Sequence, residues 1–426
     1  MRCHNVMLVS MGLLSVCAIG LWADVPTAPL SLAQCINMAL TNQADVLVGQ
    51  QSLLAAKARI TQARSNYYPQ ATFQTLPLQV NGNSGGTRSG SSDTTITVTQ
   101  NLYDGGVRET SVKQARAGAT SSTAALARTR QTVAYNVTTA YYTVLRNRHL
   151  ALVADAQVAY LDGQLKLIQA RVQAGDAAQI DALPIEAQQA NARVDQLAAK
   201  NAIRTATVQL QNAMGLQPQA AFDIAEVDDA TNQPLRPLEA YVTQAQTNRP
   251  EVVQTAAEVE AAKAGVHAAQ IANQPHLVAS GQYAAPVLSS TSATWSISGG
   301  LVYNFFNGYQ TKAAIAEART TKVSADTRAA QAMKDISTQV QEAYLNVSNA
   351  QDRLTATDIS LQAAQKNFEA QDARYKEGLG ITLDLLNAQV SVATAQSNAV
   401  QARYDYYTAL AQLAYALGTQ EDSHEK

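Results

Sequence analysis

The second half of the chain repeats the first half at a nearly constant offset. The matching positions lie 206 residues apart near the start of each half and 203 residues apart farther on. They include Thr41-Asn42 with Thr247-Asn248, Lys57 with Lys263, Pro69 with Pro275, Ala140-Tyr141 with Ala343-Tyr344, Arg171 with Arg374, Gly175 with Gly378, Asp181 with Asp384 and Gly215 with Gly418. Because chance similarity does not keep one offset over so long a stretch, the sequence predicts two copies of one structural unit.

Each copy is predicted to contain an entering helix, two strands, a very long helix and a returning helix. The repeats span residues 24–215 and 238–418, with a linker at 216–237 and a polar tail at 419–426. The entering helices are expected at 32–66 and 238–273, each ended by a Pro, which breaks helices. The strands are expected at about 70–103 and 277–305, the long helices at 107–174 and 310–377, and the return helices at 178–214 and 381–417.

The long helices are too long for the core of a compact domain. The stretch from Val107 to Ala174 lacks Pro and would extend about 100 Å as a helix. Apolar side chains recur every seven residues, which is typical of coiled-coil packing. They are Val137, Val144, Ala151, Val158, Leu165 and Val172, with Val340, Val347, Leu354, Leu361, Phe368 and Tyr375 in the second copy. The residues four positions on, such as Arg148 and Asp155, are mostly polar, which favours helices side by side around a wet centre.

Each predicted strand pair has two different faces. In Thr94 to Tyr103, apolar residues alternate with Thr and Asn, and Trp295 to Phe305 shows the same period of two. About 10 residues is the length of a tilted membrane-spanning strand, and aromatic side chains gather near the ends of such strands. The expected membrane-interface aromatics are Tyr67, Tyr68, Tyr103, Tyr283, Trp295 and Tyr303. A soluble four-stranded sheet is the alternative, but its exposed apolar face would aggregate. Four strands are too few to close a barrel, so several chains are required.

The first 23 residues have the features of a secretory signal peptide. Arg2 precedes an apolar run, and Ala23 is a small residue suited to cleavage before Asp24. A membrane anchor and lipid attachment at Cys17 are the alternatives. Cleavage would leave Cys35 as the one cysteine, expected to be a small buried residue.

Composition and motifs argue against several functions. Charged residues make up 15% of the chain, the net charge is −2, and no basic stretch would bind nucleic acid. The His and Cys residues show no metal-ligand spacing. Gly378-Leu379-Gly380 is a lone GxG, which is weak evidence for a nucleotide site. We therefore expect no enzyme activity, no cofactor and no metal.

The duplication, the strand pairs, the long helices and the segments RVQAGDAAQIDAL and RYKEGLGITLDLLNAQ together resemble the TolC-like outer-membrane factor family, the outer membrane efflux proteins. The resemblance implies a mainly α fold with a small β part. Three chains would form a periplasmic α-barrel and a 12-stranded β-barrel in outer-membrane lipid. It also implies a periplasmic adaptor and an inner-membrane transporter as partners, with the adaptor contacting the helical tips at Gly175 and Gly378.

The resemblance also implies a gate at the periplasmic entrance. Asp384, Asn387, Tyr375 and Asp181 match gate positions of the family. Where members carry a second Asp, this chain has Asn387, and where they carry a basic residue, it has Gly380. Three copies of Asp384 near a threefold axis would attract cations and disfavour anions. The alternative is that Asp384 only stabilises the dipole at a helix N-terminus.

The function expected from the sequence is that of an outer-membrane exit duct, in a tripartite efflux pump or a type I secretion system. The alternative from another class is a structural coiled-coil protein of the cell envelope, such as a surface stalk or adhesin. Paired strands at the middle of each half count against a stalk, which needs none.

Overall fold

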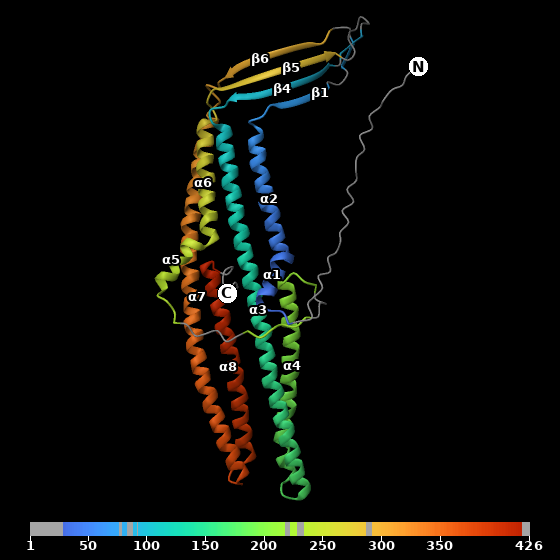
Figure 1. The fold of residues 1–426 in the computed structure, drawn as a ribbon, viewed down its shortest axis with the longest axis vertical. Helices are drawn as coiled ribbons and strands as arrows, with labels where there is room; N and C mark the ends of the chain where they lie inside the picture. The colour runs from blue at the N-terminus through green and yellow to red at the C-terminus, as the bar shows by residue number, and fades with distance from the viewer. Residues whose placement is uncertain are drawn as a thin grey trace, which may run out of the picture.

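The chain is elongated, with a sheet at one end and two helical tips at the other (Figure 1). This computed structural model describes residues 29–419 except 76–78, 83–87, 92, 218–221, 228–233 and 287–291. The predicted signal peptide and cleavage site, Cys17 and nearly all of the polar tail lie outside the described residues.

The two halves have the same order of elements. The first half contains α1 (Leu32–Asn42), α2 (Ala44–Ser65), β1 (Gln70–Thr75), the short pair β2 (Gln79–Gly82) and β3 (Arg88–Ser91), β4 (Asp93–Tyr103), α3 (Val107–Ala174), the 3-10 helix η1 (Gln179–Asp181) and α4 (Leu183–Ala213). The second half contains α5 (Leu238–Asn248), α6 (Pro250–Ile271), β5 (His276–Pro286), β6 (Thr294–Val302), α7 (Gln310–Lys376) and α8 (Thr382–Leu417).

The expectation of one continuous entering helix in each half was wrong. Both helices break at equivalent residues, Gln43 and Arg249, which have extended backbones with ψ of 128° and 131°. Arg249 precedes Pro250, and a residue before Pro is pushed out of the helical region. In the first half, the Gln43 side chain accepts a hydrogen bond from the Ala44 N–H and caps the new helix.

Two further boundaries differ from the prediction. The first return helix does not begin at 178, because a 3-10 turn at Gln179–Asp181 precedes α4, which has Pro184 in its first turn. Strand β6 ends at Val302 rather than near Phe305. The partner of Val302 is His276, the first residue of β5, so the next residues of β6 have no strand to pair with.

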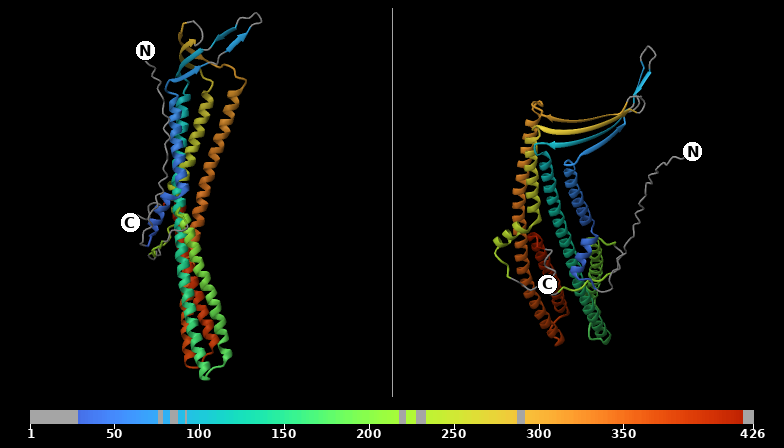
Figure 2. Two further views of the ribbon diagram at one scale, coloured as in Figure 1. Left: turned by 90° about the vertical axis from the view of Figure 1, so that its right-hand side faces the viewer. Right: turned by 45° about the horizontal axis from the view of Figure 1, so that its top comes forward.

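Two long helices run the length of the helical part, and pairs of shorter helices flank them. Helix α3 packs against α2 and α6 in its upper half and against α4 and α8 in its lower half. Helix α7 packs in the same way against α6 above and α8 below. Helix α6 lies between α3 and α7 beneath the curved sheet, as both views of Figure 2 show. The shape follows from the duplication, because each half supplies one long helix and a matching stack of short ones.

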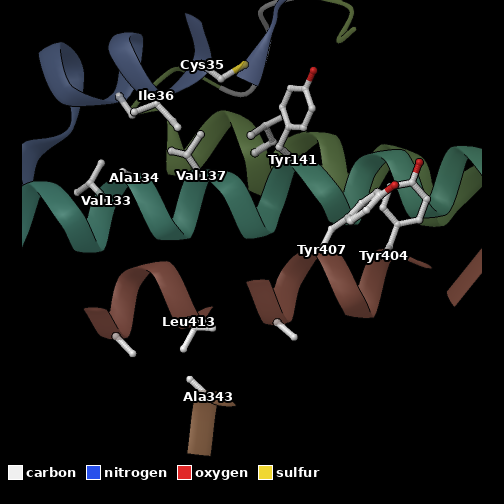
Figure 3. Packing of buried hydrophobic residues seen from close by; sticks show 14 of the residues in the cluster. Cys35, Ile36, Val133, Ala134, Val137, Tyr141, Ala343, Tyr404, Tyr407 and Leu413 are labelled. Atoms are coloured by element: carbon white, nitrogen blue, oxygen red, sulfur yellow. The ribbon is translucent and has the colours of Figure 1, made fainter. Parts of the chain in front are cut away.

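The largest apolar cluster lies where the short helices meet. Cys35 and Ile36 of α1 face Val133, Val137 and Tyr141 of α3, with α8 on the opposite side (Figure 3). Burial raises the pKa of the Cys35 thiol to about 11, so the side chain is neutral at pH 7, as expected of a small buried residue.

Tyr141 of α3 forms hydrogen bonds with both the linker and the start of the described chain. Its side chain is fully buried, and its hydroxyl lies 3.1 Å from the Leu30 carbonyl oxygen and 2.6 Å from that of Ala225. Leu30 also forms a β-bridge with Ile224. The part of the predicted linker around Ile224 and Ala225 is therefore packed against α3 in the middle of the molecule.

The predicted heptad positions are buried where α3 and α7 pack against their neighbours. Val137, Val144, Val340 and Val347 are almost fully buried. Polar positions of the same seam join neighbouring helices of one chain. Asp155 accepts a hydrogen bond from Gln196, and Asp162 forms an ion pair with Arg193, so both side chains fasten α3 to α4.

Candidate functional site

The four longer strands form one antiparallel sheet in the order β1-β4-β5-β6. Its register separates the side chains into two faces. The apolar face carries Phe73, Ile96, Val98, Leu277, Tyr283, Trp295, Ile297 and Leu301. The opposite face carries Thr72, Gln74, Thr95, Thr97, Thr99, Ser280, Gln282, Ser296 and Ser298. Ser280 and Ser298 lie opposite each other on the polar face and share a hydrogen bond of 2.8 Å.

The predicted interface aromatics fall at the two ends of this sheet. Tyr283 and Trp295 are cross-strand partners at the end farther from the helices. Tyr67, Tyr68, Tyr103 and Tyr303 lie at the end where the sheet meets the helices. Trp295 and Tyr303 are separated by about 26 Å along the chain at ~3.3 Å per residue. A strand tilted by about 35–45°, as in outer-membrane barrels, then spans an apolar band about 20 Å high, near the ~25 Å typical of such barrels.

Sequence reasoning missed two aromatic residues at the helix end of the sheet. Phe306 and Tyr309 follow β6 and are highly exposed, at 69% and 71%, as is Phe305, which the period-two pattern had placed in the strand, at 85%. Phe306 and Tyr309 lie in the strand-to-helix turn rather than in a strand, so the period-two alternation did not reveal them.

At the opposite end of the molecule, the two helical tips enclose a cleft of about 470 Å³. Its lining includes Asp181, Tyr375 and Gly378, three of the residues that the sequence predicted for the gate and the tips. Both tip glycines have the left-handed backbone that favours Gly, with φ of 85° at Gly175 and 74° at Gly378. Asp384 and Asn387 do not line this cleft.

Asp384 and Asn387 lie one helical turn apart on the exposed side of α8. Asp384 is in the first turn of the helix, and its neighbours Leu385 and Leu386 point into the protein and are buried. The carboxylate is therefore held on a short rigid turn and faces away from the chain's own core. This position satisfies the dipole at the N-terminus of α8 and also leaves the charge accessible.

Asp181 occupies the equivalent place in the first half but is engaged locally. Its carboxylate accepts a hydrogen bond of 3.1 Å from the Ala178 N–H, which caps the 3-10 turn. The two aspartates of the duplication have therefore diverged in their contacts, and Asp384 is the more available of the two.

A contact between the two halves closes the cleft at the tips. Arg171 of α3 donates a hydrogen bond of 3.3 Å to the Tyr375 hydroxyl of α7. Gly380 is packed so tightly that a Cβ atom there would lie 3.1 Å from the Tyr375 backbone nitrogen. Sequence reasoning used Arg171 only as a repeat marker and missed this contact, because residues 204 positions apart meet only in the folded chain.

In the part of the chain that the structure describes, no group of three or more His, Cys, Asp or Glu side chains could hold a metal ion. Each described helix is too short or too polar to span a membrane.

Known proteins resemble this chain over most of its length. The chain is 25% identical over 414 residues to the outer membrane efflux protein BepC of Brucella suis biovar 1 (strain 1330), covering 94% of this chain and 89% of BepC. It is 23% identical to the outer membrane protein TolC of Vibrio cholerae serotype O1, covering 93% and 91%. Among solved structures, CusC superposes with a TM-score of 0.81 at 16% identity, covering 91% of both chains.

The family model described as "Outer membrane efflux protein" matches residues 35–216 and 241–419. The two matched segments correspond to the two halves of the duplication, and together they include nearly all of the described helices and strands. The chain therefore belongs to the outer membrane efflux protein family.

Proposed function

We propose that three copies of the chain form a passive exit duct through the outer membrane. One observation carries this proposal: the sheet has one apolar and one polar face but is not closed. Among the described residues, β1 and β6 each pair with a single neighbouring strand. Three copies of this four-stranded sheet would supply 12 strands, above the eight of the smallest closed bacterial barrels.

Closing the sheet would solve two physical problems together. Open strand edges invite aggregation, and a barrel removes them. The apolar face would meet lipid, and the Thr, Ser and Gln side chains would line a water-filled lumen. The alternative of a surface stalk is set aside by the family, whose members are channels.

The helices would continue the lumen into the periplasm. In each chain α3 and α7 are about 100 Å long, and each short stack fills the space beside one of them. The duct would carry small molecules or proteins in an efflux pump or a type I secretion system without a catalytic step. In this duct each chain would consist of the two predicted repeats, the linker between them and the polar tail.

We assign the gate to the helical tips. Three Asp384 carboxylates around a threefold axis would concentrate negative charge at the entrance, with Asn387 one turn farther in. Tyr375 and Arg171 would hold the two hairpins of each chain together beside that ring, and Asp181 would keep the first tip turn in place. The exposed carboxylate of Asp384 and the Arg171–Tyr375 contact support this assignment.

The tips would also bind the periplasmic adaptor. Apolar side chains crowd this end of the chain and are exposed, namely Ile180, Leu183, Leu379, Ile381 and Leu383. An exposed apolar patch of this kind suits a protein partner. The turns at Gly175 and Gly378 would lie in this contact, and an inner-membrane transporter would complete the assembly.

The test is to measure assembly and conduction on the same preparation. Purified protein in detergent should have a protein mass by light scattering close to three times that of one chain. After reconstitution into a planar bilayer it should open long-lived, water-filled pores. A folded monomer that conducts no ions would contradict the proposal.

A further inference from the structure

Each half of the chain has a junction near the middle of the molecule, where an upper short helix begins beside the end of a lower one. In the second half α6 stands above α8, and a Cβ atom at Gly418 would lie 3.3 Å from the Arg249 Cα atom. In the first half α2 stands above α4, and a Cβ atom at Gly215 would lie 2.9 Å from the Asn42 carbonyl carbon. The two junctions therefore share one backbone arrangement.

The junction of the second half is filled by side chains of α3 from the first half. The Arg128 Nε atom lies 2.7 Å from the Glu251 carboxylate, and its Nη1 donates over 3.2 Å to the Tyr415 carbonyl. Gln131, one turn farther along α3, donates over 2.9 Å to the Gly418 carbonyl. A cation and an amide thus satisfy the acid at the start of α6 and the carbonyls at the end of α8, where a helix favours positive charge.

The equivalent junction of the first half is open. The offsets of the duplication place Asp45 at the position of Glu251 and Asn212 at the position of Tyr415. Both residues line a cleft of about 680 Å³ between α2, α3 and α4. Asp45 is exposed, whereas Glu251 is held by two arginines. The first half therefore has the same receiving site without the side chains that fill it in the second half.

The helix that would fill this site is identified by the neighbours that α7 lacks. Helix α3 packs against α1, α2 and α4 of its own half and against α6 and α8 of the other half. Helix α7 packs against α5, α6 and α8, the counterparts of the first three. In the described part of one chain it has no counterpart of the other two, and α7 lies at the opposite edge of the helical layer from α2 and α4 (Figure 1). If the duplication is applied once more, the missing neighbours are α2 and α4 of another copy.

The free side of α7 carries a cation at the level of the open junction. The counterparts of Arg128 and Gln131 are Gln331 and Lys334, so the positive charge lies one turn farther along the helix. Gln131 is 4% exposed, whereas Lys334 is exposed. In a neighbouring copy, Lys334 would meet the Asp45 carboxylate and the carbonyls at the end of α4.

A second pair of side chains on the two surfaces is also complementary. In the second half, the hydroxyls of Thr132 and Tyr415 lie 3.0 Å apart across the junction. Their counterparts are Asp335 on α7 and Asn212 on α4, an acceptor and a donor. The Asp335 carboxylate accepts one hydrogen bond of 2.7 Å from Gln331, which leaves acceptor positions for the Asn212 amide.

We propose that the open junction of each copy receives α7 of the next copy, with Lys334 bound by Asp45 and the end of α4, and with Asp335 bound by Asn212. The proposal rests on the proposed function, because it requires several copies in one ring. It makes the two versions of the contact chemically different. Inside the chain an arginine binds through its rigid fork, whereas between copies a flexible lysine binds in an open cleft, where salt screens the pair.

Charge reversal tests the pairing. Asp45→Lys and Lys334→Asp should each lower, by several degrees, the temperature at which the purified trimer dissociates on gels, because each brings like charges together. Asp45→Lys combined with Lys334→Asp should regain most of that loss. Asp45→Lys combined with Lys312→Asp is the matched control, since it carries the same total charge on α7 about 33 Å from Lys334, and it should regain nothing.

A cross-link on the wild type gives a measurement that does not depend on the folding of variants. A carbodiimide, which joins a lysine to a carboxylate without a spacer, should link Lys334 to Asp45, and mass spectrometry of the peptides identifies the pair. Because α3 and α6 separate the two residues within one chain, this link can form only between copies.

The results distinguish this contact from the proposed function. Absence of the cross-link, unchanged dissociation of both single variants, or regain in both double variants or in neither would overturn the contact. If the wild type is nevertheless a conducting trimer, the contact alone fails. If the wild type is a monomer that conducts no ions, the proposed function fails and the contact fails with it.

Discussion

Two aspartates that began as copies of one another now have different surroundings. Asp181 caps a 3-10 turn through the Ala178 N–H, whereas Asp384 stands exposed on the first turn of α8. Divergence after duplication lets one copy keep a structural role while the other is available for a different one. At the residue scale, Asp384 is therefore the position at which the gate assignment can be tested.

Replacing Asp384 by Asn keeps the size of the side chain and removes its charge. We expect the ratio of cation to anion permeability to fall toward one, and block by divalent cations to weaken, because three charges leave the entrance together. Planar-bilayer recording measures both quantities. Asp358→Asn, at an exposed acid of α7 about 27 Å from the tip end of that helix, is the matched control and should change neither. Unchanged selectivity in Asp384→Asn would mean that Asp384 serves only the helix dipole.

Arg249 is the most deeply buried charged residue among those described. It is 1% exposed, pairs with Glu251 at 2.6 Å and donates to Gln339 at 2.8 Å. Glu251 also pairs with Arg128, so one small network joins α6, α3 and α7. A buried pair of this kind is costly to break, since the remaining partner keeps its charge without full compensation.

We expect Arg249→Ala to lower the free energy of unfolding by about 3 kcal/mol, measured by denaturant titration in detergent. Lys263→Ala is the control, because its ion pair with Glu260 is exposed and should contribute nothing measurable. A loss as small in Arg249→Ala as in the control would show that the network does not hold the helices together.

At the element scale, the two faces of the sheet are suited to different surroundings, one to lipid and the other to water. Neighbouring residues of β6 lie on opposite faces: Ile297 on the apolar face and Ser298 on the polar face. The same separation holds in all four strands because the side-chain period of a strand is two. A slip of one residue in register would bring every polar side chain to the lipid side.

This arrangement predicts opposite results for two adjacent lysines. Ile297→Lys should destabilise the folded protein by about 1–2 kcal/mol in a bilayer, since a charge on the lipid face inside the interface aromatics is poorly solvated. Ser298→Lys should leave the unfolding free energy nearly unchanged and shift pore selectivity toward anions. Unfolding titrations in vesicles and planar-bilayer recordings provide the two readouts. Equal destabilisation by both lysines would show that the polar face does not line water.

At the scale of the whole molecule, the duplication lets the strand pairing between the two halves of one chain predict the pairing between neighbouring chains. Within the chain, the two halves are joined in the sheet by the pairing of β4 with β5. In a closed ring, β6 of one copy should pair with β1 of the next in the same manner. Applying the two offsets to the pair Thr99 and Ser280 brings Val302 opposite Gln74 of a neighbouring copy.

A chain carrying both Gln74→Cys and Val302→Cys should therefore form disulfide bonds between copies under mild oxidation. Non-reducing gels should show covalent species up to the trimer, which reduction returns to monomer. Phe73→Cys combined with Val302→Cys is the control, because the two side chains point to opposite faces of the sheet. Absence of cross-links in the first variant, or equal cross-linking in both, would contradict the closed-ring register.

Sequence periodicity was sufficient to predict the repeated unit and the types of its elements, and the resemblance of the whole pattern to a known family supplied the fold class and the family. A heptad pattern in α3 and a period of two in β4 are local properties, and each reflects which side chains one helix or strand must bury. The duplication then gave the order of elements in both halves. The exception was the break in the entering helices, which Pro250 marked in only one of the two copies.

Contacts between distant parts of the chain needed the tertiary structure. Tyr141 receives the linker, Arg171 meets Tyr375, and Arg249 enters an ionic network with α3 and α7. No periodic pattern in the sequence predicts these contacts, because they depend on how the long helices pack against one another. The positive φ of Tyr309 could not be predicted either. The equivalent residue of the first copy is a Gly, which suggests such a backbone, but a Tyr does not. Periodic burial thus determines the elements and their order, whereas the packing of one half against the other decides which of their polar side chains come together.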